Sequence, residues 1–127
     1  MTMIELKELL NSTPEIIGFD SVMQVIADCY HYIPTRFTNG EGSGQIRNEA
    51  GRNEGSCKIF FFAQLNHLNE KQTLACFGQY YRNDVFGHPD KNDHANIRNF
   101  IKYGWRGIQF DDIALVEKKV FLSKELE

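Results

Sequence analysis

Two imidazoles and two carboxylates lie within seven residues of this chain, in the segment His88-Pro-Asp-Lys-Asn-Asp-His94. Side chains of these types bind zinc, manganese or iron. The spacing matches no specific metal motif, and it favours a structural interpretation in which Pro89 and Asp90 form a turn and Asp93 caps a helix. The alternative is a site with a divalent metal as cofactor. Its candidate ligands are His88, Asp90, Asp93 and His94.

Cys57 could act as a nucleophile. It follows Gly55-Ser56 and opens an apolar run, so we expect it at the first position of a helix. Unpaired N–H groups and the helix dipole lower a thiol pKa at that position. With a histidine as base, the result would be a thiol hydrolase or acyltransferase, but core packing also explains a buried cysteine. Besides Cys57, the candidate base and orienting residues are His67, His88, His94, Asp90 and Asp93.

Other polar side chains could bind a ligand without reacting with it. Apart from Tyr80, they occupy a Gly- and Asn-rich stretch, residues 38–56, and a second polar stretch, residues 82–99. Arginines could hold a phosphate or carboxylate, and glycines would let backbone amides approach a ligand. No phosphate-loop pattern is present, because the first stretch lacks a Gly-Lys-Ser or Gly-Lys-Thr ending. The candidate ligand-binding residues are Asn48, Asn53, Tyr80, Arg82, Asp84, Asp93, His94, Asn96 and Arg98.

Helical periodicity predicts five helices that position these residues. Their expected spans are about 3–11, 21–32, 57–68, from Asn69 to before Gly87, and from Asn92 or Asp93 to about Gly104. The expected caps are Thr2, Ser21, Ser56, Asn69, and Asn92 or Asp93. The Ile-Phe-Phe-Phe core of the third element also suits a buried strand, but its length favours a helix. Gly78, inside the fourth helix, would let a neighbouring element approach closely.

The polar stretch at residues 38–56 is long for a connector, since loops of more than about 12–15 residues are uncommon in compact domains. We therefore expect a long polar loop that serves as a lid or a binding loop, or that is disordered in part, over residues 40–44. The tail, residues 111–127, could dock as a strand or as a short helix. A short strand pair could come from this tail or from the region around Arg36-Phe37. The expected fold is mainly α, a single compact domain of about five helices over residues 1–127.

Composition narrows the classes of function. The chain of 127 residues fits one domain, and its net charge of −3 gives no argument for a nucleic-acid or membrane-surface partner. Three cysteines fit thiols in a reducing compartment. We expect no membrane span and no Sec signal, because no apolar run approaches about 20 residues. Ten Phe, five Tyr and one Trp are expected mainly to build the core.

Several motifs in a fixed order carry a resemblance to a known family. They are Asn48-Glu-Ala-Gly-Arg-Asn-Glu-Gly-Ser-Cys-Lys-Ile-Phe60, Phe77-Gly-Gln-Tyr-Tyr-Arg-Asn-Asp-Val85, Asp93-His-Ala-Asn-Ile-Arg-Asn-Phe100 and Gly104-Trp-Arg-Gly-Ile108. Over about residues 3 to 110 the chain resembles the HopJ family, small bacterial proteins named after a type III effector. The first three of these motifs contain all of the candidate ligand-binding residues.

The resemblance implies an effector-like protein of undefined biochemical activity. We expect it to bind a small-molecule ligand or a protein partner through a polar pocket formed by the 48–57 loop and the 82–98 segment. It would be cytoplasmic or secreted into a host cell by a type III system. One alternative is a small intracellular enzyme, metal-dependent through Asp90, Asp93 and His94 or thiol-based through Cys57. Another is a plain protein-interaction module.

Overall fold

The computed structural model describes residues 1–118, so part of the expected C-terminal tail lies outside the described residues. Within residues 1–118 there are five α-helices, which confirms the mainly helical prediction. They are α1 (Met3–Ser12), α2 (Phe19–Cys29), α3 (Glu54–Leu65), α4 (Glu70–Ala75) and α5 (Ala95–Tyr103). Two small antiparallel sheets accompany them, so the described fold is not all-helical. None of these helices has the length and apolar character needed to cross a membrane.

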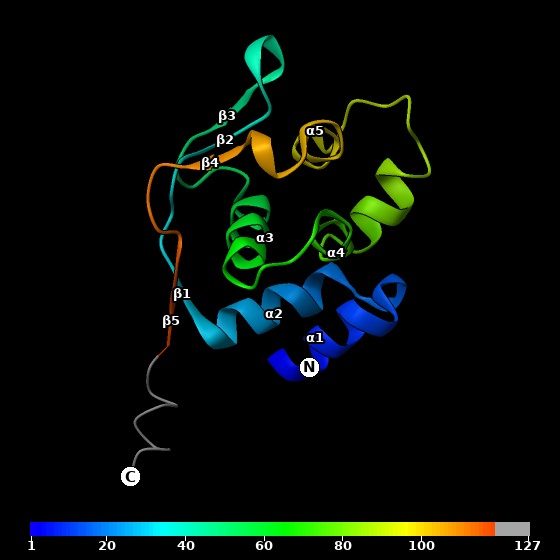
Figure 1. The fold of residues 1–127 in the computed structure, drawn as a ribbon, viewed down its shortest axis with the longest axis vertical. Helices are drawn as coiled ribbons and strands as arrows, with labels where there is room; N and C mark the ends of the chain where they lie inside the picture. The colour runs from blue at the N-terminus through cyan, green and yellow to red at the C-terminus, as the bar shows by residue number, and fades with distance from the viewer. Residues whose placement is uncertain (119–127) are drawn as a thin grey trace.

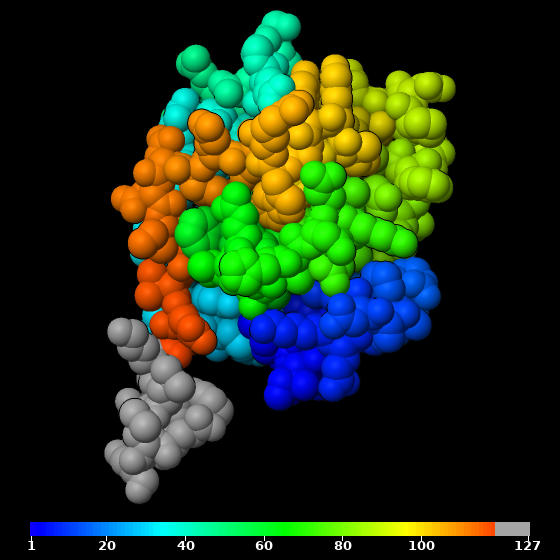
Figure 2. Space-filling view, viewed as in Figure 1, coloured from blue at the N-terminus to red at the C-terminus, as the bar shows by residue number. Residues whose placement is uncertain are grey.

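The elements are arranged in tiers around one hydrophobic core (Figure 1). The N-terminal helices α1 and α2 pack together at one end, α3 and α4 lie in the middle, and α5 lies at the other end beside the larger sheet. Figure 2 shows the N-terminal helices as a blue block directly beneath the green and yellow-green segments. Because the middle tier contacts both others, it fixes where the two polar stretches meet.

Two helices begin with the predicted N-caps Thr2 and Asn69, and each cap forms a capping box. At α1, the Thr2 hydroxyl accepts from the Glu5 backbone N–H at 3.1 Å, and the Glu5 carboxylate accepts from the Thr2 N–H at 3.0 Å. At α4, the Asn69 side chain accepts from the Gln72 N–H at 2.7 Å, and the Gln72 side chain accepts from the Asn69 N–H at 3.0 Å. Each box satisfies two backbone donors that a helix start leaves unpaired.

The prediction for α2 is wrong at both ends. Gly18, not Ser21, is its N-cap, because the Gly18 carbonyl already accepts the Val22 N–H at 3.2 Å. The helix ends at Cys29 instead of continuing to residue 32. The next residues form β1 (Tyr30–Tyr32), which pairs antiparallel with β5 (Leu115–Glu117). The sheet therefore supplies the backbone partners that a longer helix would have used. Of the two forms expected for the tail, residues 115–117 take the strand form.

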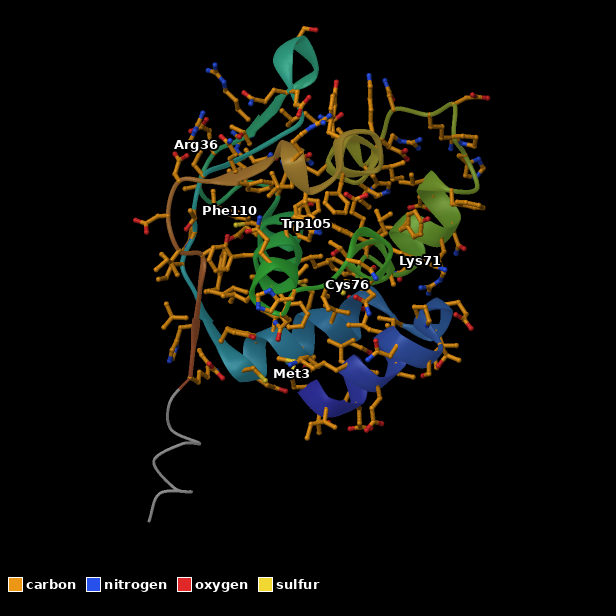
Figure 3. All side chains as sticks on the ribbon, viewed as in Figure 1. Met3, Arg36, Lys71, Cys76, Trp105 and Phe110 are labelled. Atoms are coloured by element: carbon orange, nitrogen blue, oxygen red, sulfur yellow. The ribbon has the colours of Figure 1, made fainter. Side chains whose placement is uncertain are left out.

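α3 is the central helix, as predicted, and not a strand. It starts at Glu54 rather than at Cys57, with Asn53 in the left-handed region (φ 53°) as its N-cap in place of Ser56. The aromatic core gathers around Phe60, which is fully buried. The rings around it, with centroid distances of 6.0, 5.4, 5.0 and 6.3 Å, are Phe37, Phe77, Phe100 and Trp105. Figure 3 labels Trp105 beside α3.

The predicted fourth helix is broken at Gly78, and this corrects its expected length. α4 stops at Ala75, and a π-helical turn, η3 (Tyr80–Val85), follows separately. Gly78 has φ +58°, and a Cβ atom there would lie 2.5 Å from the Phe19 backbone nitrogen. The expected close approach at Gly78 is therefore confirmed. The same approach imposes a backbone conformation that ends the helix.

The predicted long polar loop is wrong over residues 38–48, because these residues form a β-hairpin whose strands belong to a three-stranded sheet. The strands are β2 (Phe37–Asn39), β3 (Ile46–Asn48) and β4 (Ile108–Phe110), in the order β3-β2-β4 and all antiparallel. The turn η2 (Gly42–Gly44) closes the β2–β3 hairpin. Strands of three residues are too short to show alternation in sequence. The remaining short turns are η1 (Pro14–Ile16) and η4 (Gly104–Gly107).

Candidate functional site

Three asparagines form a buried cluster that fastens the sheet to α5. Asn48 and Asn96 are 1% and 7% exposed, and each donates to the other's side-chain oxygen, at 3.1 and 2.8 Å. Asn39 is fully buried and donates to the Asn96 carbonyl at 2.8 Å. We call Asn39, Asn48 and Asn96 the asparagine cluster. Most hydrogen bonds of its amide groups go to other protein groups. Asn48 and Asn96 therefore hold the walls of a site in place rather than project freely into it.

Arg98 and Asp93, two further candidates, bind each other and the loop before α5. Arg98 Nη2 donates to the Asp93 carboxylate at 2.8 Å and to the His88 carbonyl at 3.0 Å, while Arg98 Nε donates to the Asp93 carbonyl at 2.6 Å. The hydrogen bond from Arg98 lowers the pKa of the Asp93 carboxyl. Asp93 does not cap α5, because His94 occupies that position. This pair closes the loop onto the helix.

A cavity of about 380 Å³ joins the two polar stretches. On one side it is lined by residues at the start of α3, and on the other by residues at the start of α5. The polar lining residues are Asn53, Ser56, Tyr80, His94 and Asn96. The apolar lining comes from Phe19, Ile46, Phe77 and Ile97. The expected meeting of the 48–57 and 82–98 segments is therefore present as a concave, partly apolar surface.

Both helices that open at this cavity have unusual N-caps. Asn53 and His94 each adopt a left-handed conformation, with φ of 53° and 51°. Neither side chain accepts a hydrogen bond from the first turn of its own helix. The first N–H groups of an α-helix have no partner within the helix. The cavity wall thus carries backbone donors from two helices that lack the usual side-chain acceptor.

His94 is held in a defined orientation at the cavity wall. Its Nε2 lies 2.9 Å from the Asp84 carboxylate, and its ring packs on Tyr80 with centroids 5.3 Å apart. The contact with Asp84 occupies one ring nitrogen and leaves Nδ1 for another partner. Tyr80 also packs edge-on against Phe19, at 5.0 Å. Asp84 therefore orients His94 without lining the cavity itself. Tyr80 and His94 together form one wall of the cavity.

Arg82 is not brought to this cavity. It lines a different and smaller cavity with Lys71 and Tyr81. Tyr80 and Arg82 belong to the same π-helical turn, η3, yet their side chains serve different parts of the molecule. The predicted ligand-binding residues therefore fall into separate groups. The residues Asn53, Tyr80, His94 and Asn96 line the cavity, Asn48 is buried behind it, and Asp84 contacts His94. Arg98 and Asp93 form the loop clamp, a contact that closes the loop before α5, and Arg82 lines the other cavity.

The expected environment of Cys57 is wrong. α3 begins at Glu54, so Cys57 lies one turn inside the helix, and its backbone N–H donates to the Asn53 carbonyl at 3.0 Å. The side chain is 1% exposed, and its thiol lies 3.6 Å from the Thr35 carbonyl. Burial raises the pKa of the Cys57 thiol instead of lowering it. These observations describe a core cysteine, as the packing interpretation has it.

The four candidate metal ligands do not converge. His88 and Asp90 are exposed in the loop, Asp93 binds Arg98, and His94 binds Asp84. Within residues 1–118, no three His, Cys, Asp or Glu side chains gather in a group that could hold a metal ion. The geometry expected for a metal site built from these residues is therefore not found.

Several cavity residues could not be selected from the sequence. Phe19 is one, because its position at the start of α2 gave no polar or spacing signal. Its approach depends on two glycines: a Cβ at Gly55 would lie 2.9 Å from the Phe19 ring, and a Cβ at Gly78 would meet the Phe19 backbone. In the sequence, Gly55 and Gly78 indicate that another segment approaches closely, but they do not indicate that this segment contains Phe19.

Comparison with known proteins places the chain in a family. No curated protein matches it. A crystal structure described as that of the unknown function protein VPA0580 is 50% identical, with a TM-score of 0.88, and the match covers 93% of this chain and 95% of that one. The family model described as HopJ type III effector protein matches residues 3–115. This range includes the sheet, the asparagine cluster and both walls of the cavity. The chain therefore belongs to the HopJ type III effector protein family.

Proposed function

We propose that this protein acts by binding a small ligand in the cavity between the starts of α3 and α5. The single observation that carries the proposal is that residues from both polar stretches line one cavity of about 380 Å³, a size typical of small-molecule sites. The asparagine cluster and the Arg98 clamp hold these walls rigidly. A preformed wall reduces the ordering cost of binding.

The lining indicates the chemistry of the ligand. His94, Ser56 and Asn53 offer side-chain hydrogen bonds, and the starts of two helices offer backbone donors. Phe19 and Phe77 supply flat apolar surface beside them. A ligand with hydrogen-bond acceptors at one end and a small ring or apolar body at the other fits this division. Benzoate and phenyl phosphate are suitable probes.

The test is a titration of the ¹⁵N-labelled full chain with each probe, followed by backbone amide NMR shifts. We expect saturable shifts at Gly55, Ser56, Ala95 and Ile97, and a weakening of about tenfold in His94→Asn, since a hydrogen bond to a charged group contributes about 1.5–3 kcal/mol. Asparagine tolerates the left-handed conformation of this position, so the variant should keep the helix start.

The matched control is His67→Asn. His67 also has a positive φ, 55°, but it does not line this cavity, so probe binding should be unchanged. Shifts that map away from Gly55 and Ala95 would contradict the proposal. Equal weakening by both histidine variants would also contradict it, because the effect would then be unrelated to the cavity.

The interaction-module alternative depends on apolar surface beside the two polar stretches. Phe86, directly after η3, and Ile101, on α5, are 73% and 50% exposed. Other exposed apolar residues, Ile33, Ile113 and Val116, lie around β1 and β5 and away from the cavity lining. Apolar side chains exposed singly are common on protein surfaces. The cavity therefore supports small-ligand binding better than protein docking.

The place of action is proposed from the family. Its description as a type III effector supports delivery into a host cell, with a cytoplasmic role in the bacterium as the alternative. A translocation reporter fused to the chain would decide between them. Signal in host cells that depends on a working type III system supports delivery, and signal confined to the bacterium supports the alternative.

A further inference from the structure

Arg82 lies in a second cavity that the proposed function does not use. This cavity has a volume of about 160 Å³. It lies where α4 and η3 meet η1, and Figure 3 labels Lys71 at this side of the molecule, between the blue N-terminal segment and the yellow-green turn. The lining residues are Pro14, Glu15, Lys71, Ala75, Tyr81 and Arg82.

One nitrogen of the Arg82 guanidinium lacks an acceptor. Within residues 1–118, its Nη1 atom is buried and has no hydrogen-bond partner. A guanidinium keeps its charge at any ordinary pH and only donates hydrogen bonds. An unsatisfied buried donor on a charged group is costly and calls for an explanation. A bound acceptor in the adjoining cavity would supply one.

The charges of the lining favour a singly charged anion. Lys71 and Arg82 are cations, and Glu15 is the carboxylate among the six lining residues. No ion pair joins Glu15 to either cation within the described residues. One positive charge is therefore left uncompensated. A phosphate dianion would leave one excess negative charge among these groups, whereas a monocarboxylate would balance the site.

We propose that this cavity binds a carboxylate group carried on a short apolar body. The planar guanidinium of Arg82 matches the geometry of a carboxylate. Pro14, Ala75 and Tyr81 supply apolar contact for the attached carbon atoms. A volume of 160 Å³ corresponds to about five water molecules at about 30 Å³ each, which suits a molecule the size of butyrate.

A neighbouring groove allows the carboxylate to end a longer chain. A cavity of about 500 Å³ shares Pro14, Glu15 and Lys71 with the first and continues past Asn69 and Gln72. A free short-chain acid would fill only the smaller cavity. The C-terminus of a peptide would enter the smaller cavity with its carboxylate and leave the preceding residues in the groove.

The experiment titrates the ¹⁵N-labelled full chain with sodium butyrate at constant ionic strength. We expect saturable amide shifts at Lys71, Ala75 and Tyr81. Arg82→Gln should weaken butyrate binding about tenfold, because it removes a charge-assisted hydrogen bond to the carboxylate. Lys71→Gln should weaken it about twofold and Glu15→Gln should strengthen it about twofold, because these side chains are exposed and act through screened charge.

Two controls separate this site from general charge effects and from the first cavity. Arg47→Gln removes an exposed arginine of β3 and should leave butyrate binding unchanged. His94→Asn should also leave it unchanged, so failure of the proposed function and failure of this site are distinguishable. If Arg82→Gln lowers stability, the Lys71 and Glu15 variants still test the site, because both residues are exposed.

N-acetyl-Ala-Val with a free carboxylate, compared with its amide, identifies the source. Tighter binding of the free acid than of butyrate, with added shifts at Asn69 and Gln72, supports a peptide C-terminus. Equal binding supports a small acid, and either result supports the carboxylate site. Absence of saturable shifts, shifts that Arg82→Gln does not change, or a response to inorganic phosphate without one to carboxylates would each overturn it.

Discussion

Asn48 and His94 belong to neighbouring regions of the molecule and illustrate two uses of a polar residue. Asn48 is 1% exposed and its amide is bonded to Asn96, Phe37 and Asn53. His94 is partly exposed, has one bonded ring nitrogen and lines the cavity. The first region holds the sheet to α5, and the second presents chemistry to a ligand. Polar residues of one motif can therefore be essential for different reasons.

The largest expected effect comes from removing the centre of the asparagine cluster. Asn48→Ala leaves Asn96 Nδ2 without its acceptor in the interior, and should lower the free energy of unfolding by about 3 kcal/mol. His94→Asn should cost less than about 1 kcal/mol, since it breaks one partly exposed contact. Urea unfolding measures both, with Asn92→Ala, an exposed position, as control. Similar losses in Asn48→Ala and His94→Asn would remove the distinction between the regions.

Gly78→Ala tests whether the cavity wall depends on backbone contact. A Cβ there would lie 2.5 Å from the Phe19 nitrogen, and φ is +58°. We expect a loss of about 2 kcal/mol from left-handed strain and displacement of the Phe19 segment. Gly42→Ala is the matched control, because φ is +55° and a Cβ would meet nothing within 4 Å.

The difference in stability loss between Gly78→Ala and Gly42→Ala measures the effect of the contact between the added Cβ and the Phe19 backbone. Probe binding in the first cavity should weaken in Gly78→Ala and stay unchanged in Gly42→Ala. Equal stability losses would mean that strain accounts for the whole effect and that the approach of Phe19 contributes little.

Asn53 takes part in both regions, so its substitutions should have smaller and separable effects. It is the left-handed N-cap of α3 and donates to Asn48 Oδ1 at 2.7 Å. Asn53→Ala loses the hydrogen bond and strains the backbone, whereas Asn53→Gly loses only the bond. We expect Asn53→Gly to be more stable than Asn53→Ala by about 1 kcal/mol in urea unfolding. The reverse order would show that the left-handed conformation is not retained.

The smallest expected effect is a dependence on acid pH at the loop clamp. Arg98 lowers the pKa of Asp93, so the folded state favours the ionised carboxylate over the protonated carboxyl more than the unfolded chain does. The resulting stability is present above the ordinary Asp pKa of about 3.9 and is lost as pH falls through the lower folded value. The measurement is the free energy of unfolding between about pH 2 and about pH 6. The Arg98→Met variant should lose less stability than the unchanged protein as the pH falls through this range. If stability depends on pH in the same way with and without Arg98, then Arg98 is not the cause of the lowered pKa of Asp93.

Local signals in the sequence predicted the helices well. The capping box at Thr2, the N-cap at Asn69 and the helical run through Phe60 are confirmed. Boundaries failed where a distant segment intervened: β5 pairs with the residues after Cys29, and Phe19 approaches Gly78. No local pattern reports such partners, because they are separated by many residues along the chain.

The sequence by itself determined a mainly helical chain, the aromatic core and the two polar stretches, because periodicity, capping and composition act over a few neighbouring residues. Only the tertiary structure decided which polar residues are buried and which line a cavity. Asn48, Asn53, His94 and Arg82 are all polar, yet long-range hydrogen bonds and packing assign them to different places. Burial and partner geometry are properties of the folded chain as a whole, and they are set where segments distant in sequence come together.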